Sequence, residues 1–226
     1  MKVHEHPRLK VFFDLDGTLL DTVADIKDCL KKALDAHEFP LCEELSTLPI
    51  GPPLDALLHT LYPTASEAAR RMVIQTFREL YDTSDYPQTT PYPGISDLLA
   101  ELALSSDLYI ATNKVFLPTQ RLVQKFGWGS FFVDVLAPDR FGPPSLSKTE
   151  LIQRVLRDHE LLQSPCVLIG DHASDILTAT ATHLLSVAVT WGYDSLDHLK
   201  AAKPDVLVEN TEALRSWISD RKRGAQ

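Results

Sequence analysis

Asp14 and Asp16 are two carboxylates one residue apart, and they follow directly on the apolar run from Val11 to Phe13. A short apolar run that ends in a turn signal predicts a buried strand. A carboxylate at the end of a buried strand loses part of its hydration, and a bound cation would compensate that loss. We therefore expect Asp14 to be a nucleophile and Asp16 a separate general acid and base. The alternative interpretation is an Asx turn followed by Gly17, without any chemistry.

Polar side chains follow two further apolar runs. Thr112 and Asn113 come after the run that begins at Leu108, and Asp171 comes after the run that begins at Val167. Each could instead cap the helix that follows it. If the runs are strands of one open parallel sheet, their carboxyl ends meet at the edge where such sheets bind ligands. The sequence therefore predicts one site built from three strand ends.

Asp14 and Asp171 would give this site hard oxygen ligands, and Asp175 follows Asp171 by four residues. Mg²⁺ is bound through one or two carboxylates and keeps several waters. The pair therefore suits a magnesium ion, with a backbone carbonyl near Asp16 as a further ligand. The alternative is that Asp171 and Asp175 cap and charge the start of a helix.

A cluster of carboxylates that receives a phosphate also needs a fixed cation, and Lys148 is the candidate. It stands at the predicted start of the helix over 148–159, before the strand that leads to Asp171. A lysine at the start of a helix opposes the helix dipole, so we expect a carboxylate partner for it. The alternative is a solvated lysine on the protein surface.

The elements that position these residues alternate between strands and helices. Short apolar runs predict strands over 9–13, 108–111, 131–136, 167–169, 187–189 and 206–208. Apolar residues at helical spacing predict helices over 23–34, 54–61, 69–81, 95–102, 117–126, 148–159 and 175–182. Strands that alternate with helices favour an α/β fold with a doubly wound, Rossmann-like parallel sheet.

An all-helical insert interrupts this alternation, because no strand is expected between Asp21 and Tyr86. The segment from Pro87 to Pro93 holds three prolines and is predicted to be a stiff return linker. We therefore expect a core formed by residues 1–20 and 88–226, and a small helical domain at 21–87. The tail from Arg221 to Gln226 is expected to be frayed.

Composition narrows the classes of function. Of the 226 residues, 44% are hydrophobic and 23% are charged, which is typical of soluble globular proteins. The formal charge of −9 argues against nucleic acids and anionic membranes as partners. The three cysteines lack metal-like spacing, and no apolar leader or membrane-spanning run is visible. We therefore expect a cytoplasmic protein with reduced thiols.

Four segments, in this order, resemble the four motifs of the haloacid dehalogenase superfamily. They are Asp14-Leu15-Asp16-Gly17-Thr18, Thr112-Asn113-Lys114, Lys148 and Gly170-Asp171-x-x-x-Asp175. The resemblance covers nearly the whole chain, because the helical insert stands where that superfamily has a small helical cap. Trp191-Gly192-Tyr193 and Gly51-Pro52-Pro53-Leu54 resemble the phosphoglycolate phosphatase-like branch.

The resemblance implies a Mg²⁺-dependent phosphatase that hydrolyses a small phosphorylated metabolite, such as phosphoglycolate, through an aspartyl-phosphate. It implies that Asp14, Asp16 and Lys148 are catalytic, and that Thr112 and Asn113 bind the substrate phosphate. The metal ligands that it implies are Asp14, Asp16, Asp171 and Asp175.

The second carboxylate, Asp16, favours phosphoryl transfer, because the dehalogenases of this superfamily lack a carboxylate there. Two alternatives stay open: a sugar-phosphate mutase of the same superfamily, and a catalytically silent regulatory protein. A monomer or a homodimer is expected, with substrate contacts from the cap at Ile50–Leu54 and Lys27.

Overall fold

The computed structural model describes residues 8–40, 54–143, 145–158 and 165–224. A six-stranded sheet forms its centre, in the order β5-β4-β1-β6-β7-β8, and all of its strand pairs are parallel. The strands are β1 (Leu9–Phe13), β4 (Ser106–Ala111), β5 (Phe132–Leu136), β6 (Cys166–Gly170), β7 (Leu185–Val189) and β8 (Val206–Val208). Each strand predicted from an apolar run is present at its expected place in the chain.

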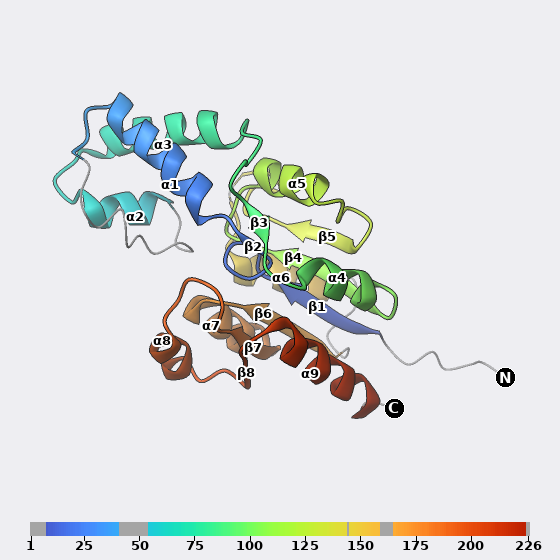
Figure 1. Cartoon of the computed structure of the whole chain (residues 1–226). Helices are drawn as coiled ribbons and strands as arrows, with labels where there is room; N and C mark the ends of the chain where they lie inside the picture. Colours follow the sequence, from blue (N-terminus) through green and yellow to red (C-terminus); the bar gives the residue numbers. More distant parts are fainter. Residues whose placement is uncertain (1–7, 41–53, 144, 159–164, 225–226) are drawn as a thin grey trace.

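Helices cover both faces of the sheet (Figure 1). The first face packs against α4 (Ile95–Ala103), α5 (Phe116–Lys125) and α9 (Thr211–Gly224), and the second against α6 (Lys148–Asp158), α7 (Ala173–Thr182) and α8 (Leu196–Ala201). Side chains of β1 alternate between the two layers: Val11 and Phe13 lie in the first cluster and Phe12 in the second. Because both faces are buried, β1 is apolar at nearly every position. The doubly wound α/β fold is confirmed.

Three helices form a separate layer beyond the carboxyl ends of the strands (Figure 1). They are α1 (Val23–Ala36), α2 (Leu54–Leu61) and α3 (Glu67–Tyr81). Their apolar faces bury Leu30, Leu58 and Val73 in a cluster of their own. The helical insert therefore has its own small core, and we call these helices the cap. The limits of 21 and 87 for the cap stay a prediction.

A short ladder joins the two segments that connect core and cap. β2 (Leu20–Asp21) pairs with β3 (Thr90–Pro91) in antiparallel register, Leu20 opposite Pro91 and Asp21 opposite Thr90. This segment was predicted to be a stiff return linker, with no statement about its pairing. The expectation of no strand from Asp21 onward was wrong at that residue. Two residues are too few to show a strand periodicity, so only the tertiary contact reveals the ladder.

The C-terminal part of the chain also departs from expectation. Neither α8 nor α9 was predicted. Because α9 continues as far as Gly224, the expectation of fraying is wrong for residues 221–224, whereas residues 225–226 lie outside the described part of the chain. α9 buries Leu214 and Ile218 against the first face of the sheet. Tertiary packing of those two residues stabilises the helix, whose remaining positions are mostly polar.

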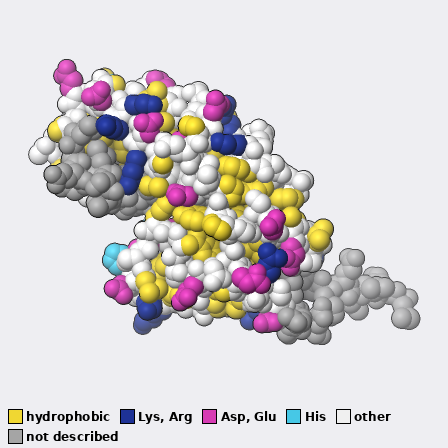
Figure 2. All heavy atoms as spheres, in the orientation of Figure 1, with side chains coloured by type: hydrophobic (Ala, Val, Ile, Leu, Met, Phe, Trp, Pro, Cys, Tyr) yellow, Lys and Arg dark blue, Asp and Glu magenta, His cyan; other side chains and the backbone are white. Residues whose placement is uncertain are grey.

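Acidic and basic side chains are interspersed on the face of the molecule seen in Figure 2, on the cap as well as on the core. Within the described ranges, the helices are all too short or too polar to cross a bilayer.

Candidate active site

The site begins where β1 ends between β4 and β6. Phe13 pairs with Ile110 on one side and with Ile169 on the other, so the three strands finish at the same edge of the sheet. The backbone N–H of Asp14 still donates to Ile169 O over 2.9 Å, which holds Asp14 directly at the strand end. The chain then turns at Gly17, whose φ of +84° is a conformation that side-chain-bearing residues rarely adopt.

Three carboxylates meet at this edge. One oxygen from each of Asp14, Asp171 and Asp175 lies within 4.8 Å of the other two, and all three residues are buried. Asp175 belongs to the first turn of α7, where its carboxylate also accepts from the backbone N–H of His172 over 3.2 Å. Both interpretations of Asp175 therefore apply. Its negative charge lies at the N-terminus of α7, and its carboxylate also faces those of Asp14 and Asp171.

Lys148 lies between two of these carboxylates. Its ammonium group is 3.0 Å from Asp14 Oδ1 and 2.5 Å from Asp175 Oδ1, and its side chain is only 6% exposed. Burial works against the charged lysine, but the two carboxylates outweigh burial and raise the pKa of Lys148 above its usual value. The predicted partner of this helix-start lysine is thus a pair of aspartates, and the alternative of a solvated surface lysine is wrong.

One lysine does not neutralise three carboxylates. Burial raises the pKa of Asp14 well above its ordinary value, although Lys148 partly opposes this. Burial also raises the pKa of Asp171 to about 7. Burial is the main cause of both shifts, and the negative charge of Asp175 adds to each of them. A buried set of carboxylate oxygens with unbalanced charge fits a hard divalent cation such as Mg²⁺.

The carboxylate of Asp16 has different partners. Its Oδ1 accepts from Thr22 Oγ1 over 2.5 Å and lies 3.1 Å from the ammonium group of Lys114. Two neighbouring carboxylates of one turn therefore occupy distinct environments, the arrangement that separates a nucleophile from an acid and base. The Asp16 side chain is not part of the three-carboxylate cluster, and a backbone ligand from this residue stays a prediction.

Thr112 and Asn113 follow β4 at the same sheet edge. The backbone N–H of Thr112 donates to Leu136 O over 3.0 Å, and its hydroxyl accepts from the backbone N–H of Lys114 over 3.1 Å. Thr112 is buried and Asn113 is half-buried. The register of β4 beside β1 brings both residues to the end of the sheet that carries Asp14.

Comparison with known proteins gives the family. A family model of haloacid dehalogenase-like hydrolases matches residues 11–189. The chain belongs to this family. Its matched range includes all four segments from Asp14 to Asp175 that resemble the superfamily motifs.

Three known proteins are similar to this chain over most of its length. The phosphoglycolate phosphatase of Vibrio vulnificus (strain CMCP6) is 28% identical over 213 residues, which cover 90% of this chain and 93% of that protein. A predicted phosphatase from Clostridium acetobutylicum has a similar crystal structure, with a TM-score of 0.84, 26% identity, and coverage of 95% of this chain and 99% of that one. The tyrosine-protein kinase PtkA of Mycobacterium tuberculosis (strain ATCC 25618 / H37Rv) is 29% identical over 205 residues, which cover 90% of this chain and 69% of that protein.

Three residues contribute to the site of this hydrolase without having been predicted. Thr18 Oγ1 donates to Asp171 Oδ1 over 2.8 Å, and the backbone N–H of Tyr193 donates to Asp171 Oδ2 over 2.8 Å. Lys114 contacts Asp16, as described above. All three stand inside segments that carry the family resemblance, but their partners are distant in sequence, so only the folded chain shows their contacts.

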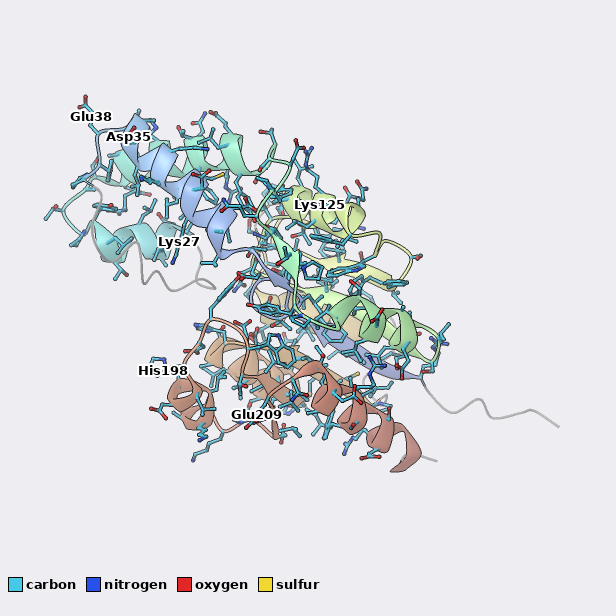
Figure 3. All side chains as sticks on the ribbon, in the orientation of Figure 1. Lys27, Asp35, Glu38, Lys125, His198 and Glu209 are labelled. Atoms are coloured by element: carbon cyan, nitrogen blue, oxygen red, sulfur yellow. The ribbon has the colours of Figure 1, made fainter. Side chains whose placement is uncertain are left out.

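The cap touches this site through α3. Lys114 Nζ donates to Tyr81 Oη over 2.9 Å, so one side chain links the core residue Asp16 with the cap. Lys27, which we expected to contact substrate, lies on the cap helix α1 (Figure 3). The expected contact loop Ile50–Leu54 lies outside the described residues except for Leu54.

Proposed function

We propose that this hydrolase is a Mg²⁺-dependent phosphatase, which cleaves a small phosphorylated metabolite through an aspartyl-phosphate on Asp14. One observation carries the proposal: a buried aspartate stands in a cluster with two further carboxylates and a lysine, while a second aspartate of the same turn has separate partners. The family match and the phosphatase names of two of the relatives agree with it.

Asp14 is the nucleophile in this proposal. A carboxylate oxygen attacks the phosphorus atom, the bond from phosphorus to the ester oxygen breaks, and the phosphoryl group becomes covalently attached to Asp14. Water then attacks the same phosphorus, the bond to Asp14 breaks, and inorganic phosphate leaves. The covalent step divides one slow reaction, the hydrolysis of a phosphate monoester, into two faster ones.

Asp16 moves the proton in both halves of the reaction. It donates a proton to the ester oxygen as that oxygen leaves, and it later takes a proton from the attacking water. Its hydrogen bond from Thr22 and its ion pair with Lys114 hold the carboxylate apart from the nucleophile. Such separation suits two carboxylates with different tasks.

The remaining residues of the site interact with the charged groups of the reaction: the nucleophile, the phosphate and the metal ion. Lys148 orients Asp14 through their 3.0 Å contact and supplies positive charge beside the transferring group. Thr112 and Asn113 are proposed to donate hydrogen bonds to phosphate oxygens. Asp14, Asp171 and Asp175 would hold Mg²⁺, with Asp16 as a further ligand through its backbone, and the ion would offset the charge of the phosphate and of the nucleophile.

The substrate class follows from the relatives and from the cap. The Vibrio vulnificus relative is named a phosphoglycolate phosphatase, so 2-phosphoglycolate is the first substrate to test. A small cap over the sheet edge suits a small leaving group and can exclude water from the site. A cytoplasmic location and a monomeric or homodimeric state complete the proposal.

A mutase is the second candidate, since an aspartyl-phosphate can also pass its phosphoryl group to a sugar hydroxyl. One relative is named a tyrosine-protein kinase, a class of enzyme that transfers a phosphoryl group to a hydroxyl group other than that of water. The family match therefore does not identify the phosphoryl acceptor. A silent regulatory protein need not keep its catalytic groups, whereas this chain has Asp14, Asp16 and Lys148 together with the acidic cluster.

The test measures phosphate release from a panel of small phosphomonoesters, including 2-phosphoglycolate and a hexose 1-phosphate, with Mg²⁺ and with a chelator. We expect Mg²⁺-dependent release by the wild-type protein and none by Asp14→Asn. The highest kcat/KM identifies the substrate class. Clear activity of Asp14→Asn would contradict the mechanism, and isomerisation of the hexose phosphate without phosphate release would establish the mutase.

A further inference from the structure

The first turn of α1 lacks a cap from its own side chains. The first backbone N–H groups of any helix have no partner within the helix, and a side-chain oxygen at the residue before the helix commonly accepts from them. Thr22 stands at that position in α1 but makes no such hydrogen bond. The carboxylate of Asp21 accepts from the backbone N–H of Val23, but over a long 3.4 Å, so the helix start can still take a nearer acceptor from elsewhere.

Tyr193 supplies this acceptor from the core. Its hydroxyl oxygen accepts from the backbone N–H groups of Thr22 over 2.7 Å and of Val23 over 3.1 Å. The same hydroxyl donates to Asp21 Oδ1 over 3.0 Å. These three hydrogen bonds match the one proton and two lone pairs of a tyrosine hydroxyl. Thr22 Oγ1 lies farther from the same hydroxyl, at 3.5 Å.

This capping by Tyr193 leaves the Thr22 hydroxyl available for another role. Thr22 Oγ1 donates to Asp16 Oδ1 over 2.5 Å, and Thr22 is fully buried. A threonine that capped its own helix would turn its hydroxyl oxygen toward the N–H groups of α1 instead. Thr22 therefore holds the Asp16 carboxylate, together with Lys114, through a hydroxyl that does not cap α1.

Tyr193 is itself held at the acidic cluster. Its backbone N–H donates to Asp171 Oδ2 over 2.8 Å. The preceding residue, Gly192, approaches so closely that a Cβ there would lie 2.2 Å from the Cβ of Asp171. The ring of Tyr193 also packs against the apolar cluster of the cap. One residue therefore touches the cluster, the entrance to the cap and the cap interior.

We propose that Tyr193 is a positioning residue, which caps α1 so that Thr22 can hold Asp16 in place for proton transfer. The effect on catalysis rests on the proposed phosphatase function, whereas the capping and the placement of Asp16 do not. Tyr193 acts through Thr22 and need not touch the substrate.

Tyr193→Phe tests this inference, because it removes the hydroxyl and keeps the ring and the backbone N–H. Tyr62→Phe is the matched control, since the Tyr62 hydroxyl donates to Pro40 O over 2.8 Å, an acceptor that follows the C-terminal end of α1 and not its start. In NMR spectra we expect faster amide exchange at Thr22 and Val23 and a shifted Asp16 carboxyl carbon resonance in Tyr193→Phe, and neither change in Tyr62→Phe.

The kinetic part of the test uses the best substrate of the phosphomonoester panel. Tyr193→Phe is expected to lower kcat by about tenfold or more with little change in KM, because a small displacement of a catalytic group is costly. Thr22→Val should cause a similar loss. Because both changes act on Asp16 through one contact, the double variant should lose little more than Thr22→Val alone.

Independent, multiplicative losses in the double variant would overturn the inference, and so would an Asp16 resonance that stays unchanged in Tyr193→Phe. These outcomes can be distinguished from a failure of the proposed function, in which the wild-type protein itself would release no phosphate from any ester. In that case the amide exchange and the Asp16 resonance alone support or overturn the role of Tyr193.

Discussion

Gly17 lies against Asp171 so closely that a Cβ on Gly17 would be 2.1 Å from Asp171 Oδ2. Its φ of +84° is in addition a conformation that favours glycine. The turn after the first strand therefore has two separate reasons for a glycine. It brings the backbone of one motif into contact with a carboxylate of another.

Gly17→Ala should consequently disturb both folding and the acidic cluster. We expect the free energy of unfolding to fall by about 1–3 kcal/mol because of the strained backbone. Activity should fall by about tenfold or more because Asp171 has to move. Gly129→Ala is the control, since a Cβ on Gly129 would meet no atom within 4 Å. Urea unfolding and phosphate release measure the two effects, and equal behaviour of the variants would contradict the steric argument.

Lys148→Met should destabilise the metal-free protein. It leaves the buried carboxylates of Asp14 and Asp175 without their cation, and loss of one partner from a buried ion pair costs about 3 kcal/mol. Urea unfolding in a chelator measures this loss, and Mg²⁺ should restore part of it. Lys32→Met removes an exposed ion pair with Asp28 on α1 and should change stability little. A Lys148→Met protein as stable as the wild type would refute the structural role.

The stability of the metal-free protein should depend on the protonation of Asp171. Its pKa is raised from the ordinary value of 3.8 to about 7 in the folded chain. Between these values the folded state holds a proton that the unfolded state has released, so this group's contribution to stability decreases as pH rises through that window and is lost above about pH 7. Unfolding in a chelator across this range should show the decrease, and Asp171→Asn should reduce it. An unchanged slope in the variant would assign the dependence to other groups.

Asp16→Asn should slow the enzyme according to the leaving group. An alkoxide such as that of 2-phosphoglycolate needs a proton as it leaves, so its cleavage should slow by about 10²–10⁴-fold. Cleavage of p-nitrophenyl phosphate should lose less in the first step, because nitrophenolate leaves without protonation. Single-turnover measurements on both esters provide the comparison. Equal losses for the two esters would contradict the role of Asp16 as the acid.

The predictions from sequence were most accurate where a local pattern determines an element. The run from Leu9 to Phe13 is apolar except at Lys10 because both faces of its strand are buried, and the structure has β1 with the same limits. The acidic cluster was foreseeable as well, because carboxyl ends of parallel strands share one edge. Asp14, Asp171 and Asp175 do meet there.

Elements stabilised by distant contacts escaped prediction. β2 and β3 have two residues each and exist because Leu20 lies opposite Pro91. The contacts of the Asp16 carboxylate also depend on residues that are distant in sequence. Thr22 is close to Asp16 in sequence, but Tyr193, which accepts from the backbone N–H groups at the start of α1, follows a different strand and is brought there only by folding.

The sequence by itself determined the fold class, the family and the types of residue in the candidate site, because strand burial, helical periodicity and motif spacing are local properties of the chain. The tertiary structure alone decided how those residues are paired. It placed Lys148 between two aspartates, gave Asp14 and Asp16 different surroundings, and joined the cap to the core through Tyr193. These pairings depend on distances between side chains that are far apart in the chain, and such distances are defined only when the sheet and the cap have packed.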